Sequence, residues 1–359
     1  MTLHIFNPEH DIALAYNRKH LTVPHAAQEL RMSLGWIPVL WAADGDAVLV
    51  DDVSYAIKAA TKYFHKKVDV LFISKEDLRN FLFTHISPWG WDLTLKTMLL
   101  ENGISNDLLP DDSVLLQQRQ LSNRRQTTEA LAFLRSDLEQ VTCGESTYVT
   151  SEQDVSSLLA SLRQIVVKAP WSSSGRGVRY VDGQLSPSVR GFIRNVLHTQ
   201  GGVMVEPFYH KLRDFGMEFE AMPDGNVEYL GLSLFETHNG AYTGNLLATE
   251  EEKREILERY LSPDILEGLI DRVKRYFLPA LRGIFTGPFG LDMMIVAHPS
   301  QKGYLLHPCV EINLRRTMGH VALSIPHLST DVKQLMSIVY DVNYQLKINN
   351  IENNYVITL

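Results

Sequence analysis

IVVKAPWSSSGRGVRYV, residues 165–181, is the stretch of sequence that decides the fold. A β-branched run typical of a buried strand ends at Lys168, a Ser/Gly loop follows, and a second strand begins at Val178. Backbone N–H groups in such a loop can approach anionic oxygens closely, and a lysine at the strand end adds a point charge. The stretch therefore predicts a loop that binds a polyphosphate; a plain turn between two strands is the alternative.

Composition sets the protein class around this loop. A chain of 359 residues, 45% of them hydrophobic, is long enough for two or three units packed around one cleft. A formal charge of −8 argues against nucleic acid as a partner. Two cysteines, Cys143 and Cys309, form neither a disulfide framework nor a zinc cluster, which favours a reducing compartment. Without a signal-peptide pattern or a long apolar run, we expect a cytoplasmic protein with no membrane partner.

The first unit, residues 1–113, alternates short apolar runs with amphipathic stretches. Apolar runs at 3–6, 37–41 and 68–73 predict strands, and the segments 25–34, 76–83 and 93–102 predict helices. This alternation indicates an α/β fold class with a Rossmann-like parallel sheet. The dinucleotide motif G-x-G-x-x-G is absent after the first strand, where Asn-Pro-Glu-His-Asp stands at 7–11, so no dinucleotide site is expected.

Two further units are predicted, of mixed α+β character. Residues 114–200 begin with an apolar strand, continue with a helix from 122–125 to 134, and place a helix at 151–163 before the Lys168 strand. Residues 201–359 begin with a strand at 203–207 and a hairpin of 217–222 and 227–233. Thr249 and Glu252 form a capping-box pattern at the start of one helix, and Ser262 starts a second helix with apolar residues at helical spacing. Two apolar strands come after them, at 291–297 and 304–312.

Three oxygen-bearing side chains mark these last two strands. Asp292 lies in GLDMMIV, and Glu311 and Asn313 alternate in CVEIN, so the latter two share a strand face. If the strands are neighbours, the three oxygens converge as a site for Mg²⁺ bridging nucleotide phosphates. The alternative is an ordinary salt bridge at solvated strand ends, or a carboxylate that accepts structural hydrogen bonds. Arg315, two residues on, would face the same cleft and stabilise charge on a transferred group.

The ordered segments VVKAPWSSSGRGV, VMVEPF, GLDMMI and EINLRR resemble the ATP-grasp superfamily of carboxylate–amine or carboxylate–thiol ligases. In detail they are similar to the motifs of biotin carboxylase and carbamoyl-phosphate synthetase, over residues 114–330. The resemblance implies a Rossmann-like pre-ATP-grasp unit followed by an ATP-grasp fold of two subdomains, with ATP and Mg²⁺ as cofactors.

The resemblance also assigns roles by position. It implies that Lys168 contacts phosphates and acts in catalysis with Arg315, and that Asp292, Glu311 and Asn313 hold Mg²⁺. It implies that a mobile loop closes over the phosphates, and that a hinge meets the adenine. The loop residues are Ser172, Ser173, Ser174, Gly175, Arg176 and Gly177, and the hinge residues are Glu206, Pro207 and Phe208.

The sequence departs from the family pattern at several positions. Relatives often carry a further lysine before the loop strand; here Arg124 or Arg125 stands near that place, keeping the charge and changing the geometry. Three serines replace glycines in the loop and add hydroxyl donors. Arg213 is either a substrate or phosphate contact, or half of an exposed ion pair with Asp214.

The acceptor substrate is expected at the end of the first strand. Asn7, His10 and Asp11 follow that strand, where open α/β sheets tend to bind ligands. The alternative is that Asn7 or Asp11 caps a helix and His10 is solvated. Trp89 and Trp91 either stack on a substrate or anchor packing.

The sequence thus predicts an ATP-dependent ligase that activates a small-molecule or peptide carboxylate for attack by an amine or thiol, releasing ADP and phosphate. An ATP-grasp kinase or other phosphotransferase, and a nucleotide-binding regulator without turnover, are the alternatives. A homodimer is possible on the same resemblance.

Overall fold

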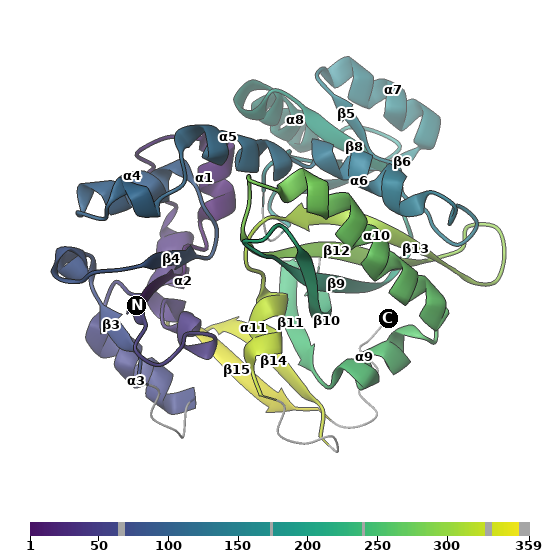
Figure 1. Ribbon diagram of the computed structural model, residues 1–359. Helices are drawn as coiled ribbons and strands as arrows, with labels where there is room; N and C mark the ends of the chain where they lie inside the picture. The colour runs from purple at the N-terminus through teal and green to yellow at the C-terminus, as the bar shows by residue number, and fades with distance from the viewer. Residues whose placement is uncertain (64–68, 173–174, 239–240, 327–331, 352–359) are drawn as a thin grey trace.

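A computed structural model describes residues 1–63, 69–172, 175–238, 241–326 and 332–351. It contains three β-sheets with helices packed on them (Figure 1). One sheet is parallel and two are antiparallel, which confirms the mixed α/β fold class. Within this part of the chain, no helix combines the length and apolar character needed to cross a membrane.

The first sheet is the predicted Rossmann-like unit. Its four parallel strands have the order β3-β2-β1-β4. The strands are β1 (Thr2–Ile5), β2 (Ala47–Leu49), β3 (Leu71–Ile73) and β4 (His85–Pro88). The helices are α1 (His10–Tyr16), α2 (His25–Leu34), α3 (Val53–Tyr63) and α4 (Leu93–Glu101).

Two predictions in this unit were wrong in detail. The apolar run 37–41 is a short 3₁₀ helix, Ile37–Leu40, because Pro38 has no N–H to give to a central strand. The strand lies instead at Ala47–Leu49, a segment too short to show alternation. The helix expected at 76–83 is also a 3₁₀ turn, Lys75–Asn80, opened by a capping box between Ser74 and Asp77.

The second sheet is small and carries its own core. Its antiparallel order is β5-β8-β6-β7. The strands are β5 (Thr147–Val149), β6 (Gln164–Lys168), β7 (Val178–Asp182) and β8 (Val203–Pro207). Helices α7 (Glu152–Leu162) and α8 (Pro187–Gln200) pack on it and close a cluster made only of residues from this region.

The prediction of a strand beginning at residue 114 was wrong. The segment is helix α5 (Asp112–Leu121), which buries Leu115 and Gln118, three residues apart on one helical face. Helix α6 (Arg125–Arg135) follows as predicted and packs on the third sheet.

The third sheet has seven antiparallel strands in the order β13-β12-β9-β10-β11-β14-β15. The predicted hairpin is β9 and β10, and the two late apolar strands pair as β12 and β13. The strands are β9 (Lys211–Ala221), β10 (Val227–His238), β11 (Ala241–Leu247), β12 (Gly287–Ala297), β13 (Tyr304–Asn313), β14 (Gln334–Tyr340) and β15 (Tyr344–Asn350).

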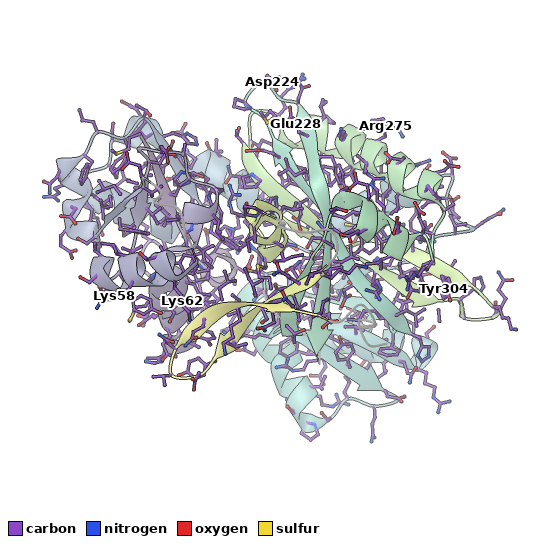
Figure 2. The ribbon with its side chains drawn as sticks, turned by 90° about the horizontal axis from the view of Figure 1, so that it is seen from below. Lys58, Lys62, Asp224, Glu228, Arg275 and Tyr304 are labelled. Carbon is purple, nitrogen blue, oxygen red and sulfur yellow. The ribbon has the colours of Figure 1, made fainter. Side chains whose placement is uncertain are left out.

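Helices cover both faces of this sheet. The core helix α10 (Pro263–Leu281) and α9 (Glu250–Leu257), with its predicted Thr249–Glu252 capping box, lie on the same face as α6. Helix α11 (Met318–Ser324) lies on the other face, toward the N-terminal unit. Seen from below, the charged side chains of Lys58, Asp224 and Arg275 point outward from the periphery (Figure 2).

The N-terminal unit and the large sheet share one apolar cluster. Trp36, Val48 and Trp89 of the first unit belong to the same cluster as Met336 and Leu346 of β14 and β15. The small sheet has no part in that cluster. The division of the chain after residues 113 and 200 remains a proposal.

We predict that Phe289→Ala lowers the free energy of unfolding by about 3–5 kcal/mol, because a fully buried ring leaves a cavity when truncated. Phe289 is 0% exposed and stacks on Phe219 with ring centroids 5.5 Å apart. Urea unfolding measures the loss. Tyr340→Ala, at a 57% exposed position, is the control and should cost less than about 1 kcal/mol. Similar losses in both variants would contradict this packing.

Candidate active site

A cavity of about 680 Å³ lies between the small and the large sheet. It contains most of the residues predicted to bind nucleotide, brought together from β6, β8, β12 and β13. Its lining includes Arg124, Val166, Lys168, Gly175, Val178, Tyr180, Glu206, Pro207, Phe208, Met294, Asp292 and Glu311.

Lys168 and Glu206 form a buried ion pair in the wall of this cavity. Strands β6 and β8 are hydrogen-bonded neighbours, and Lys168 Nζ lies 2.6 Å from Glu206 Oε2. The hydroxyl of Ser146 donates to Glu206 Oε1 at 3.2 Å. Both charged side chains are buried, so the pairing removes the cost of an isolated charge. Lys168 keeps further N–H donors for a ligand, since an ammonium has three.

Arg124 is buried behind the phosphate loop. Its Nη1 donates to the carbonyl of Ala169 and to Ser172 Oγ, both at 2.7 Å. Its Nη2 donates to the carbonyl of Ser172 at 2.9 Å and to Glu311 Oε1 at 2.5 Å. The predicted phosphate ligand therefore holds the start of the loop against a carboxylate of the large sheet.

The loop itself is described at both ends. Gly175, at φ +70°, lines the cavity, and Arg176 is exposed. Gly177 packs so tightly on Ser172 that a Cβ there would lie 2.1 Å from Ser172 Oγ. The backbone approach expected of a phosphate loop thus has a structural requirement for glycine. Ser173 and Ser174, also predicted to bind phosphate, lie outside the described residues.

The predicted hinge, Glu206 to Phe208, lies where the chain leaves the small sheet. The Phe208 ring meets the ring of Tyr180 edge to face, with centroids 6.1 Å apart. Tyr180, Val166 and Met294 give the cavity an apolar wall that the sequence analysis missed. Tyr180 on β7 and Val166 on β6 are register partners, so strand alternation in the quoted stretch was the signal that could have found them.

Asp292, Glu311 and Asn313 converge as predicted. Asp292 of β12 faces Glu311 of β13 in register, and Asn313 hydrogen-bonds Asp292. Burial, and then the nearby Glu311 charge, raise the pKa of Asp292 above its usual range. Two carboxylates held this close gain from a cation between them.

The donor set fits Mg²⁺. No group of three or more His, Cys, Asp and Glu side chains with metal-site geometry occurs among the described residues, so a closed protein cage is not built here. Two carboxylates and one amide oxygen instead leave positions for water and phosphate oxygens, which is how Mg²⁺ is commonly bound in nucleotide sites.

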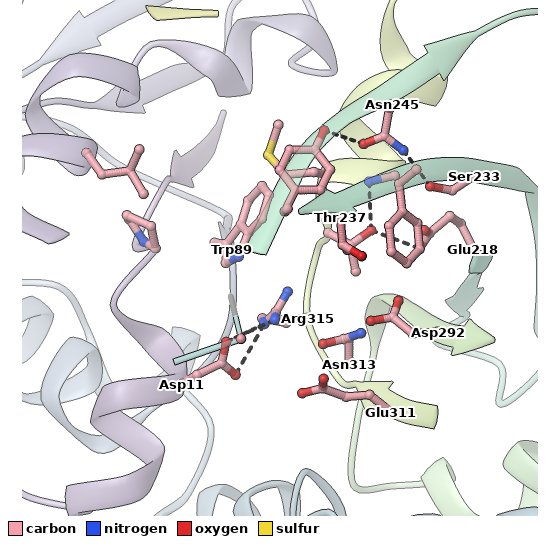
Figure 3. A pocket seen from close by; sticks show the side chains of 18 of the residues that line it. Asp11, Trp89, Glu218, Ser233, Thr237, Asn245, Asp292, Glu311, Asn313 and Arg315 are labelled. Atoms are coloured by element: carbon pink, nitrogen blue, oxygen red, sulfur yellow. Dashed lines mark hydrogen bonds and ion pairs between the residues drawn. The ribbon is translucent and has the colours of Figure 1, made fainter. Parts of the chain in front are cut away.

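A second cavity, of about 250 Å³, opens on the other side of these carboxylates (Figure 3). It lies between the N-terminal unit and the face of the large sheet that carries α11. Five residues line both cavities: Gly175, Phe235, Thr237, Asp292 and Glu311. The two cavities therefore meet at the predicted metal site.

Arg315 enters the second cavity and binds Asp11 across the unit boundary. Its Nε and Nη2 lie 3.0 and 2.9 Å from Asp11 Oδ2 (Figure 3). Burial would raise the pKa of Asp11, but the charge and hydrogen bond of Arg315, together with the other positive groups nearby, outweigh it and lower the pKa. Arg315 Nη1 also donates to the carbonyl of Arg316 at 3.1 Å. Three of its five N–H groups are thus used in these contacts, and two remain for a ligand.

The predicted acceptor residues divide between the cavity and the core behind it. Asp11 lines the cavity, but Asn7 and His10 are buried on Asp92, at 3.2 and 3.4 Å from its Oδ2. Asp92 also caps α4, so this network fixes the strand ends. No side chain caps α1, whose N-cap is Glu9, so the capping alternative was wrong.

Of Trp89 and Arg213, only Trp89 lines a cavity. Trp89 lines the second cavity, with its ring edge-on to Phe6 at 5.0 Å. Arg213 is not brought into either cavity, because it alternates with Asp214 on β9 and lies over the ring of Tyr260 instead.

Glu218 is the main residue that sequence reasoning missed. It is 2% exposed, lines the second cavity, and its Oε2 lies 2.9 Å from Thr317 Oγ1 and 3.0 Å from His320 Nδ1. Burial, followed by the Asp292 charge, raises its pKa to about 8. A glutamate between Met217 and Phe219, both core residues, was the available signal.

Comparison with known proteins identifies the fold. No protein-family model and no curated protein sequence matches the chain. The structure is similar to N5-carboxyaminoimidazole synthetase from Staphylococcus aureus complexed with ADP, at a TM-score of 0.50 and 13% identity, covering 94% of this chain and 82% of that one. It is also similar to the biotin carboxylase–β,γ-ATP complex from Campylobacter jejuni, at a TM-score of 0.51 and 11% identity, covering 94% and 75%.

Both of these structures have the ATP-grasp fold, and so does this chain. The expected architecture, a Rossmann-like unit followed by the ATP-grasp fold, is confirmed.

We predict that Glu218→Gln removes a pH dependence of stability. Above the ordinary glutamate pKa of 4.5, the folded protein holds a proton on Glu218 that the unfolded chain has lost, until pH reaches about 8. The contribution of Glu218 to the free energy of unfolding therefore falls as pH rises through this window, by at most about 1.4 kcal/mol per pH unit. Urea unfolding of both proteins at several pH values measures it. A constant difference between them across the window would contradict the raised pKa.

Proposed function

We propose that the protein is an ATP-dependent ligase that activates a carboxylate as an acyl phosphate for attack by an amine, or by a thiol, with release of ADP and phosphate. ATP and Mg²⁺ are its cofactors, and its substrates are small molecules or short peptides. We further propose that it works in the cytoplasm and that a homodimer is a possible assembly.

The meeting of the two cavities at Asp292 and Glu311 carries this proposal. A nucleotide in the larger cavity, with its phosphates under the Gly175 loop, has its terminal phosphate at the shared wall. A carboxylate in the smaller cavity, held by the free N–H groups of Arg315, reaches the same wall. Transfer between two substrates needs this proximity.

The reaction has two balanced steps. A substrate carboxylate oxygen attacks the γ-phosphorus of ATP, the bond from that phosphorus to the β-γ bridging oxygen breaks, and ADP leaves. The amine lone pair then attacks the carbonyl carbon, the carbon–oxygen bond to phosphate breaks, and phosphate leaves while the amine gives its proton to phosphate or solvent. Water has to be excluded between the steps, because it hydrolyses the acyl phosphate.

The following predicted residues have roles in the scheme: Lys168, Arg124, Arg315, Asp292, Glu311 and Asn313. Lys168 offers its remaining N–H groups to phosphate oxygens while Glu206 fixes its position. Arg124 holds the start of the loop, at Ser172, against Glu311. Arg315 orients the carboxylate and stabilises negative charge on the transferred group. Mg²⁺, held by Asp292, Glu311 and Asn313, would neutralise phosphate charge.

We predict that the wild-type protein, given ATP, Mg²⁺ and hydroxylamine, forms a hydroxamate with at least one member of a panel of carboxylates. Hydroxylamine traps acyl phosphates, so the product reports the proposed intermediate directly. ADP release is measured in parallel. Glu311→Gln should lower the rate about 100-fold or more, because it removes a metal ligand while the protein still folds. A phosphorylated product without hydroxamate would show a phosphotransferase instead.

We predict that Lys168→Gln weakens ATP binding about tenfold or more, because a charge-assisted contact to phosphate is lost. Glutamine keeps a donor for Glu206, so the folded state is retained. The rise in unfolding temperature caused by ATP and Mg²⁺ measures the affinity. Lys58→Gln, on the outer face of α3, is the control and should show the wild-type rise. An equal rise in Lys168→Gln would remove Lys168 from the nucleotide site.

A further inference from the structure

The inner wall of the second cavity is built from three adjacent strands. Glu218 lies on β9, Ser233 on β10 and Asn245 on β11, which are neighbours in the large sheet. All three side chains are buried, and Tyr242 lines the cavity beside them. None belongs to a motif found in the sequence, and none has a part in the phosphoryl transfer described above.

Hydrogen bonds link the side chains of this wall, among them the bond between Asn245 and Ser233 (Figure 3). The Tyr242 hydroxyl donates to Asn245 Oδ1, and Asn245 Nδ2 donates to Ser233 Oγ at 2.7 Å. Ser233 in turn hydrogen-bonds the carboxyl group of Glu218. Because each hydroxyl hydrogen is directed along the wall, the oxygens of Tyr242, Asn245, Ser233 and Glu218 keep lone pairs for a ligand.

The far side of Glu218 is closed by α11. Thr317 Oγ1 donates to Glu218 Oε2 at 2.9 Å. His320 places Nε2 3.2 Å from the carbonyl of Phe219, and its Nδ1 accepts from the Thr317 N–H at 3.1 Å. A Cβ at Gly319 would lie 1.9 Å from Glu218 Oε1. These contacts fix the carboxyl group in one orientation, in which it forms part of the cavity wall.

The rest of the cavity has a different chemistry. Arg315 supplies two N–H donors beside the metal site, on the side opposite this wall. An apolar part of the remaining surface comes from both units: Phe6, Leu30, Trp89, Phe235 and Met318. A volume of about 250 Å³ holds one small molecule.

Resting on the ligase function proposed above, we propose that the second cavity binds a free α-amino acid with an apolar side chain as the carboxylate substrate. Its ammonium group lies on the acceptor wall of Glu218, Ser233 and Asn245, and its carboxylate lies at Arg315. An ammonium has three donors and no acceptor, which matches a wall of lone pairs. Its charge also favours the ionised form of Glu218 and a charge-assisted hydrogen bond.

This arrangement separates the two ends of the amino acid. The carboxylate faces the phosphate of ATP, while the ammonium group is held protonated away from the acyl phosphate. The protonated amine has no lone pair for attack, so the nucleophile is a second molecule.

The test compares amino acids with their deaminated counterparts in the hydroxylamine assay. The probes are L-leucine, L-methionine and L-phenylalanine, against 4-methylpentanoate, 4-(methylthio)butanoate and 3-phenylpropanoate. At least one amino acid should form hydroxamate with kcat/KM about 100-fold or more above its counterpart, because the deaminated acid leaves the polar wall unpaired. Equal rates, or faster reaction of the deaminated acid, would overturn the inference.

Variants assign the discrimination to the wall. Glu218→Gln should lower the ratio of kcat/KM for the amino acid to kcat/KM for its deaminated counterpart about 10-fold or more. Ser233→Ala should act in the same direction. Glu220→Gln, on the same strand and strand face but outside the cavity lining, is the control and should match wild type. Wild-type discrimination in Glu218→Gln would overturn the assignment.

The two proposals fail in different ways. Hydroxamate from other carboxylates of the panel, and none from these amino acids, overturns the amino-acid inference and leaves the ligase standing. The absence of hydroxamate with every carboxylate overturns the ligase function. Binding of an ammonium group at the wall is then tested by the rise in unfolding temperature with each amino acid alone. A rise in wild type that Glu218→Gln lacks supports the ammonium site, and no rise in either protein overturns it.

Discussion

The geometry of the site depends on the hydrogen bonds that the Arg124 guanidinium donates. It joins three segments far apart in sequence: the start of α6, the Ala169–Ser172 turn after β6, and Glu311 on β13. A planar fork with five donors can make these bonds at once, which a lysine cannot. Because one bond ends on Glu311, the start of the phosphate loop and the carboxylate pair have a fixed spacing. The larger cavity lies between them, and the second cavity begins where they meet.

Local sequence predicted the elements whose own residues determine them. The α9 capping box, the buried face of α10 and the β9–β10 hairpin follow from patterns within a few residues. The failures at 37–41 and 114 are of another kind. Both are short apolar runs, which helix and strand share, and only Pro38 in one and the spacing of Leu115 and Gln118 in the other distinguish them.

Site residues were predictable where they lie on strands that are adjacent in sequence. They were not predictable where single residues from several strands come together. Asp292, Glu311 and Asn313 were found because two strands adjacent in sequence are also adjacent in space. Glu218, Ser233 and Asn245 come from neighbouring strands too, but each stands alone among apolar residues and has no motif. The Asp11–Arg315 pair joins residues about 300 positions apart, which one sequence cannot reveal. Asn7 and His10 lie at the predicted strand end, but the structure buries them behind the cavity, whereas the prediction had them line it.

The apolar cluster shared by the first unit and the last strands has a consequence for synthesis. Trp36, Val48 and Trp89 are made well before Met336 and Leu346, which complete their core. At about 5–20 residues per second, a ribosome needs tens of seconds to span that interval. During that time the nascent Rossmann-like unit exposes the apolar surface that strands β14 and β15 later cover. The small sheet, whose core lies entirely within residues 149–205, can fold long before that surface is covered.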